Sequence, residues 1–220
     1  MFAVESLGSV AQLLSNVYSE RIEPAAEAEQ LGVVRGAIGL FLIRDDGSNG
    51  SKLAKEVVSS FGYWNARTGH FFDGIFLGWG YDQQPAYLDS GFFSCIHELE
   101  NLLDWRYEGG AQLILGDFVY SPAERQGHLD FSSCVSLDLS KLLEEKKYAQ
   151  LAPLVEEIVR PLRNHSNGQA PSPTWRVSDY IAVLRTRKFV WQELIKKVGS
   201  LLGWADDVAN FAVRDLRRRS

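Results

Sequence analysis

The sequence predicts an α/β protein whose core is a three-layer arrangement of helices around a mixed β-sheet. Two observations carry this prediction. Apolar runs short enough for strands alternate with helical apolar patterns, and one short connection joins the last two strands. From residue 33 to residue 163 the expected order is strand, helix, strand, helix, strand, strand, helix. An N-terminal helix precedes this core, and a C-terminal helical arm follows it.

Composition limits the classes of protein to consider. The chain has 220 residues, of which 45% are hydrophobic and 23% charged, as suits one globular domain with a smaller appendage. A net charge of −5 gives no general attraction to nucleic acid or to anionic membranes. No apolar run approaches the roughly 20 residues that cross a bilayer, and the N-terminus lacks a basic leader. We therefore expect a cytoplasmic protein with no membrane partner.

The first half of the core is expected between residues 2 and 61. Apolar residues at spacings of two to four predict an amphipathic helix over residues 2–18. Residues 33–44 are almost continuously apolar, which is typical of a strand buried on both faces. A Gly/Ser/Asn turn follows, and the pattern of residues 51–61 predicts a helix with Ser51 as its N-cap.

The second half of the core is expected between residues 71 and 163. Residues 71–80 predict a strand closed by glycines, residues 81–90 a loop, and residues 91–107 a helix stopped by Gly109 and Gly110. Residues 111–120 and 129–137 predict two strands, and the eight-residue connection between them favours an antiparallel hairpin. The two longer crossovers allow the first three strands to lie parallel. A long helix, capped by Ser140 and interrupted or bent at Pro153, completes the core.

The C-terminal quarter has a different composition. Residues 163–175 are rich in Ser, Asn, Gly and Pro and predict a linker between an α/β domain, residues 1–165, and a helical arm, residues 176–220. The arm pattern indicates two helices that meet near residues 199–203, with a wide apolar face. Its aromatic residues, Tyr180, Phe189, Trp191, Trp204 and Phe211, suit an interface with a protein partner or a second copy. Packing of the arm on its own domain is the alternative.

The order of elements over residues 33–163 resembles the thioredoxin-like fold. In thioredoxins the redox cysteines lie at the turn from strand to helix, where this chain has Asp45-Asp46-Gly47-Ser48-Asn49-Gly50. The two cysteines, Cys95 and Cys134, form no Cys-x-x-Cys motif. The resemblance therefore implies the fold without its usual disulfide exchange.

The turn from residue 44 to residue 50 is the first candidate site. Ligands of open α/β sheets bind beyond the carboxyl ends of parallel strands, which favours Arg44, Asp45, Asp46, Asp117 and Tyr120 as the lining. An Asp pair can hold Mg²⁺ with several waters retained, and Arg44, Ser48 and Asn49 would contact a ligand. The alternative is structural: an aspartate caps the turn, and Gly47 or Gly50 supplies a positive φ.

Glu98 is the second candidate. Cys95, Glu98 and Leu99 give Cys-x-x-Glu-Leu on a helix, which resembles the catalytic-glutamate helix of TIR domains, where a glutamate promotes cleavage of the glycosidic bond of NAD. The alternative is an amphipathic helix with a solvated acidic side. The four histidines are scattered, without metal-ligand spacing, so we expect no metal site of their making.

The sequence favours a non-redox interaction or assembly protein that docks a partner, or associates with itself, through residues 176–220. No cofactor is predicted for that function. The alternative is a small hydrolase or nucleotide-processing enzyme, directed at NAD or a Mg²⁺-nucleotide, with Asp45, Asp46, Glu98 and Asp117 as catalytic residues. Nucleic acid would be reached only through the basic tail, Arg217 to Arg219.

Substitutions in the first turn separate its structural role from a catalytic one. If the turn only starts the helix, Gly47→Ala or Gly50→Ala will lower the free energy of unfolding by at least about 1 kcal/mol, because alanine is strained at positive φ. Asp45→Asn and Asp46→Asn will then leave both the melting temperature and partner binding nearly unchanged. Loss of function in the Asp→Asn variants at an unchanged melting temperature would instead establish a ligand site.

Overall fold

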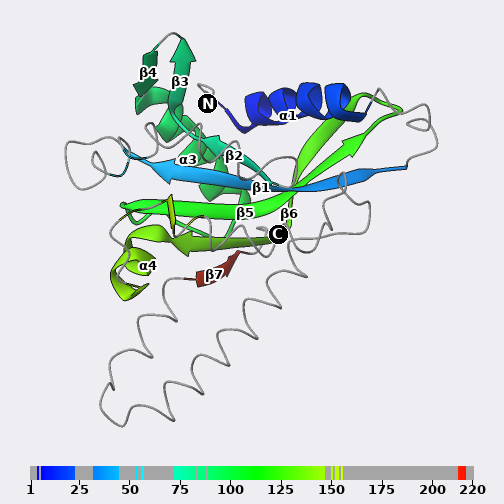
Figure 1. Cartoon of the computed structure of the whole chain (residues 1–220). Coiled ribbons are helices and arrows are strands. Elements are labelled where there is room, and N and C mark those ends of the chain that lie inside the picture. Colours follow the sequence, from blue (N-terminus) through cyan, green and yellow to red (C-terminus); the bar gives the residue numbers. More distant parts are fainter. Residues whose placement is uncertain are drawn as a thin grey trace.

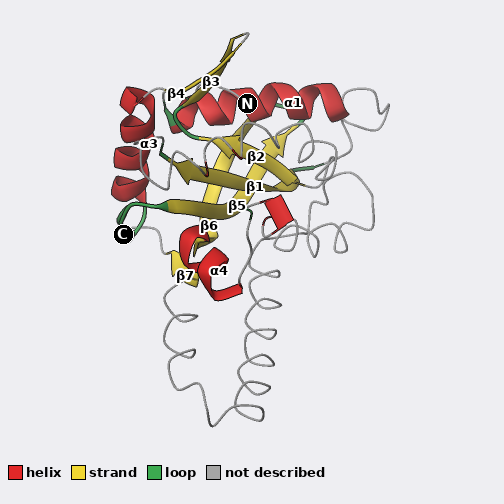
Figure 2. Cartoon of the chain, turned by 60° about the vertical axis from the view of Figure 1, so that its left-hand side comes forward, coloured by secondary structure: helices red, strands yellow, loops and turns green. Residues whose placement is uncertain are grey.

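A mixed five-stranded sheet forms the centre of the computed structural model, in the order β2-β1-β5-β6-β7 (Figure 1). The structure describes residues 4, 6–22, 32–44, 53, 56, 72–82, 84–87, 89–146, 150, 152–153, 155 and 213–216. Helices lie beside the sheet, and a small two-stranded sheet stands apart from it (Figure 2). The prediction of an α/β fold with a mixed sheet is confirmed.

Strand β1 (Val34–Ile43) lies inside the sheet between β2 and β5, and all of its residues except Arg35 are buried. It confirms the strand predicted over residues 33–44. β1 pairs in parallel with β2 (Phe72–Phe76) and antiparallel with β5 (Ala111–Ser121). The expectation that the first three strands lie parallel is therefore wrong for β5. The connection between β2 and β5 is long enough to bring the chain back to either end of the sheet. The apolar pattern of the sequence does not indicate at which end β5 begins.

Strands β5 and β6 (Gln126–Asp138) form the predicted antiparallel hairpin. In its turn, the backbone N–H of Arg125 donates to the carbonyl oxygen of Pro122 at 3.3 Å, and Arg125 adopts a φ of 52°. The register shifts between Leu115, which pairs with Val135, and Asp117, which pairs with Asp130, so the pairing of β5 and β6 is irregular at this point.

Helices α1 (Leu7–Ile22) and α3 (Asp89–Leu102) bury their apolar faces in one core with the sheet. Members of this core include Leu14, Tyr18, Ile38, Leu40, Phe92, Leu99, Ile114 and Phe118. α1 begins five residues later and ends four residues later than the 2–18 range predicted. α3 ends at Leu102, before the predicted Tyr107, because Glu100 accepts a hydrogen bond from the backbone N–H of Tyr107 and pairs with Arg106.

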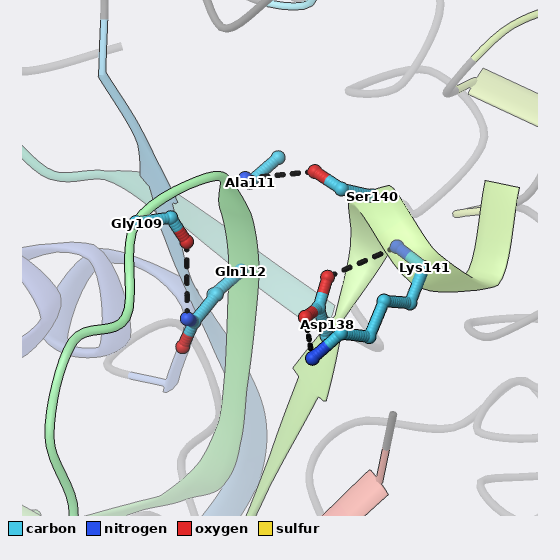
Figure 3. A network of polar contacts seen from close by, with 6 residues as sticks. All are labelled: Gly109, Ala111, Gln112, Asp138, Ser140 and Lys141. Carbon is cyan, nitrogen blue, oxygen red and sulfur yellow. Dashed lines mark hydrogen bonds and ion pairs between the residues drawn. The ribbon is translucent and has the colours of Figure 1, made fainter. Parts of the chain in front are cut away.

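Helix α4 (Leu139–Lys146) begins directly after β6, and its cap is Asp138 and not the predicted Ser140, which lies inside the helix. Figure 3 shows how its start is fixed. Asp138 accepts a hydrogen bond from the backbone N–H of Lys141 at 3.0 Å, and Ser140 accepts one from the backbone N–H of Ala111 at 3.1 Å. The bond to Asp138 caps α4, and the bond to Ser140 joins the first turn of α4 to the beginning of β5.

A β-hairpin lies where the sequence predicted the end of one strand and a loop. β2 ends at Phe76, and Gly78, with a φ of 77°, turns the chain into β3 (Trp79–Asp82). β3 pairs antiparallel with β4 (Gln84–Tyr87). The expectations of a single strand over residues 71–80 and a loop over residues 81–90 are therefore wrong, because the turn at Gly78 divides the apolar run.

Strand β7 (Val213–Leu216) pairs antiparallel with β6 and forms an edge of the described sheet. The sequence predicted helix here, so that expectation is wrong for these four residues. Leu216 is buried in the core with Cys134, its partner in the register, and this contact with a distant strand outweighs local propensity. Most of the predicted arm lies outside the described residues. Of the helix expected over residues 51–61, Leu53 and Glu56 are described, and both are helical.

Gly36 offers a test of how α1 packs on the sheet. A Cβ atom at residue 36 would collide with the hydroxyl of Tyr18, whereas one at Gly32 would meet nothing within 4 Å. We expect Gly36→Ala to lower the free energy of unfolding by about 1–3 kcal/mol in chemical denaturation, because the added methyl group would overpack the core. Gly32→Ala is the control and should stay within about 0.5 kcal/mol of the wild type. Equal stabilities of the two variants would contradict this packing.

Candidate functional site

The carboxyl end of β1 is where the sequence placed its first candidate site. Arg44 follows β1, and its guanidinium lies over the ring of Phe93 at 4.8 Å from the centroid. Phe93, near the start of α3, is 44% exposed, so the pair reaches the surface. Asp45, Asp46, Ser48 and Asn49 lie outside the described residues.

The same end of the sheet holds a network of structural hydrogen bonds. Ile43 pairs with Ala111, and Gln112 pairs with Asp138, so the starts of β5 and α4 lie beside the end of β1. The Gln112 amide donates to the carbonyl oxygen of Gly109 at 3.2 Å, and the Lys141 ammonium pairs with Asp138 at 3.0 Å (Figure 3). These polar groups hold strand and helix ends together.

Glu98 lies on α3 and binds the beginning of α1. Its Oε2 accepts a hydrogen bond from the backbone N–H of Leu7, the first residue of α1, at 3.1 Å. A carboxylate at this position satisfies one of the unpaired N–H groups of a helix and interacts favourably with the helix dipole. The glutamate that resembles the TIR catalytic residue is thus engaged in a contact between two helices.

Neither cysteine is prepared for thiolate chemistry. Both are free and buried. Burial, together with the nearby Glu98 carboxylate, raises the pKa of Cys95 to about 12, and burial raises the pKa of Cys134 to about 12. The Cys95 thiol donates to the carbonyl oxygen of Val4 at 3.5 Å. A thiol with a pKa this high is almost entirely protonated at neutral pH, so it is a poor nucleophile.

Asp117, the predicted site residue on β5, is completely buried. Its neighbours in sequence, Gly116 and Phe118, face the core that contains α1, because a Cβ at Gly116 would meet Ile38 and Cys134. Side chains alternate along a strand, so Asp117 lies on the opposite face of the sheet. Glu98 lies on the α1 side. The structure therefore does not bring Glu98 and Asp117 together.

An ion pair that the sequence reasoning missed crosses the sheet beside Asp117. Arg35 on β1 reaches Asp130 on β6, and the Nη1 to Oδ2 distance is 2.8 Å. Asp130 also accepts a hydrogen bond from the backbone N–H of Ser132 at 2.9 Å. Asp130 lies opposite Asp117 in the register of β5 and β6, so the ion pair is next to the buried Asp117. In the sequence, a charged residue, Arg35, within an otherwise apolar strand was the signal that could have indicated this ion pair.

A second ion pair joins α1 to β2. Both guanidinium nitrogens of Arg21 bind Asp73, each at 2.8 Å. The hydroxyl of Tyr18 hydrogen-bonds to the same carboxylate, and burial, reinforced by this anion, raises the Tyr18 pKa well above its usual value. Asp73 thus holds the last turn of α1 on the sheet.

The described residues contain no group of three or more His, Cys, Asp or Glu side chains that could hold a metal ion. Among the helices that the structure describes, none is both long enough and apolar enough to span a bilayer. Comparison with known proteins finds no matching family model, no matching curated protein and no matching solved structure.

The ion pair of Asp130 predicts a pH dependence of stability. Burial alone would raise the pKa of this carboxyl, but hydrogen bonds from Ser132 and Arg35 outweigh it and lower the pKa from 3.8 to about 2. A lowered folded-state pKa stabilises the protein above pH 4, and this stabilisation is lost as the pH falls from about 4 to about 2. We expect Asp130→Asn to cost about 1 kcal/mol at pH 7, allowing for solvent screening, and to cost less at pH 2.

Urea denaturation at both pH values checks this expectation. Asp104→Asn is the matched control, because Asp104 is exposed and its substitution should leave stability within about 0.5 kcal/mol. A cost for Asp130→Asn that stays the same at pH 7 and pH 2 would contradict an electrostatic role for this carboxylate.

Proposed function

We propose that this chain is a non-catalytic interaction protein that binds a protein partner, or a second copy of itself, through residues 176–220. The observation that carries the proposal is the contact between Glu98 and the first backbone N–H of α1. It gives a structural role to the described glutamate that best resembled a catalytic residue. The buried, protonated cysteines support the same conclusion.

The position of β7 supports a proposal that the α/β domain holds the segment between α4 and β7 at both of its ends. The chain leaves β6 into α4 at Leu139, and it returns as β7, where Val213 pairs with Leu137. Both attachments therefore lie at the same end of one strand. A segment held at both ends by a stable sheet loses less entropy on binding than a free tail of the same length.

We also propose that the domain has a thioredoxin-like topology without redox activity. The parallel pair β1 and β2, the adjacent β5–β6 hairpin and the following α4 support this topology. The buried cysteines lie on α3 and β6, away from the turn after β1 where thioredoxins carry their redox pair. The domain then serves as a scaffold for the arm.

Light scattering coupled to size-exclusion chromatography tests the proposed function on the full chain. We expect a mass above the 24.7 kDa of one chain, either from self-association or from a partner that copurifies in a fixed ratio. Phe189→Asp with Trp191→Asp should reduce the mass to that of one chain, because two charges would enter an apolar interface. Truncation at residue 175 is unsuitable, since it also removes β7.

Val33→Asp is the matched control. Val33 is an apolar residue that is 45% exposed at the start of β1, outside the proposed interface. This variant should keep the mass of the wild type. A wild-type protein that runs as a single chain without a partner would contradict the proposal, as would equal effects of the arm and control substitutions.

A further inference from the structure

Strand β7 is held on the described sheet by one neighbouring strand. Its residues pair with β6 alone, in a register that runs from Val213 opposite Leu137 to Leu216 opposite Cys134 (Figure 1). Strand β5 pairs with the other edge of the same stretch of β6, for example through Leu113 opposite Leu137. Departure of β7 would therefore leave the pairing of β5 with β6 in place, so β7 can open without unfolding the sheet.

The stretch of β6 beneath β7 is buried. Residues 134–137, here called the β6 slot, are each at most 5% exposed, and so is Leu216, which packs against them. The Cys134 thiol lies 4.0 Å from the carbonyl oxygen of Leu216. Backbone N–H and C=O groups that lose their partners in such surroundings cost free energy, and an unpaired edge is a template for another strand. The β6 slot therefore requires a strand to fill it.

A long stretch of chain separates β7 from the helix that follows β6. Residues 147–212 lie between the end of α4 and Val213. The local concentration of a tethered strand falls as its tether lengthens, so a long tether reduces the advantage that the chain's own β7 has over the β7 of a second copy. Since β7 belongs to the segment proposed above to associate, residues 176–220, association would bring the second β7 close to the slot.

We propose that two copies of this chain exchange β7, so that residues 213–216 of each copy fill the β6 slot of the other. The inference rests on the proposed function and names the partner as a second copy of this chain. The backbone pairs of β7 and the burial of Leu216 would all be re-formed between the copies. Exchange of an identical element therefore loses none of these contacts, which is why it is an easy route to a dimer.

Disulfide formation between two differently tagged full-length chains tests the exchange. Residues 134 and 216 are directly paired across antiparallel strands, a separation that a disulfide can bridge. One chain carries Leu216→Cys with Cys134→Ser, and the other is unaltered. After co-expression and oxidation with diamide, we expect a disulfide between the introduced thiol and Cys134 of the other chain. A non-reducing gel and mass spectrometry of the joined peptides detect it.

The matched control carries Leu102→Cys with Cys134→Ser, because Leu102 is an exposed leucine on α3. It should form at least about tenfold less of the disulfide to Cys134 of the other chain, since disulfide exchange depends on access to the second sulfur. Equal yields from the two thiols would overturn the proposal. If Leu216→Cys does not fold, Val213→Cys in one chain and Leu137→Cys in the other test the opposite end of the register.

A single chain with Leu216→Cys and an unaltered Cys134 reports the closed arrangement. In an associated protein, we expect most of its disulfide to join two chains. If the protein associates but the disulfide forms only within one chain, the exchange is overturned and the proposed function stands. If the protein runs as a single chain without a partner, both are overturned.

Discussion

The contact between Tyr18 and Gly36 sets how closely α1 approaches the sheet. The tyrosine side chain occupies the space that a Cβ at residue 36 would need, so only glycine allows this approach. The Tyr18 ring also packs at 5.0 Å from Phe118 and at 6.0 Å from Tyr120, measured between centroids. Because Tyr18 is buried, its hydroxyl requires a partner, and the Asp73 carboxylate supplies one.

Polar contacts fix α1 along its whole length. Glu98 binds the N–H of Leu7 at its start, and Ser15 accepts a hydrogen bond from the N–H of Gly127 at 2.9 Å near its middle. At its end, Arg21 binds Asp73 with two hydrogen bonds, a geometry that fixes orientation as well as distance. These side chains, whose chemistry would suit catalysis, therefore position a helix. For this reason we propose that binding takes place through other parts of the chain.

The described strands differ in how their edges are paired. β7 pairs with the edge of β6 that β5 does not occupy, and the register of β5 and β6 shifts next to the pair formed by Asp117 and Asp130. The β3–β4 hairpin, by contrast, pairs with no other described strand.

Sequence alone determined β1 and the β5–β6 hairpin, because each follows from a local signal: a continuous apolar run or a short connection. Tertiary structure decided the direction of β5, the strand character of residues 213–216 and the roles of Glu98 and Asp130. Each of these depends on a partner distant in sequence, such as Leu7 for Glu98, Arg35 for Asp130 and Cys134 for Leu216. Local periodicity reports which residues are apolar, whereas pairing across the fold decides which of them meet.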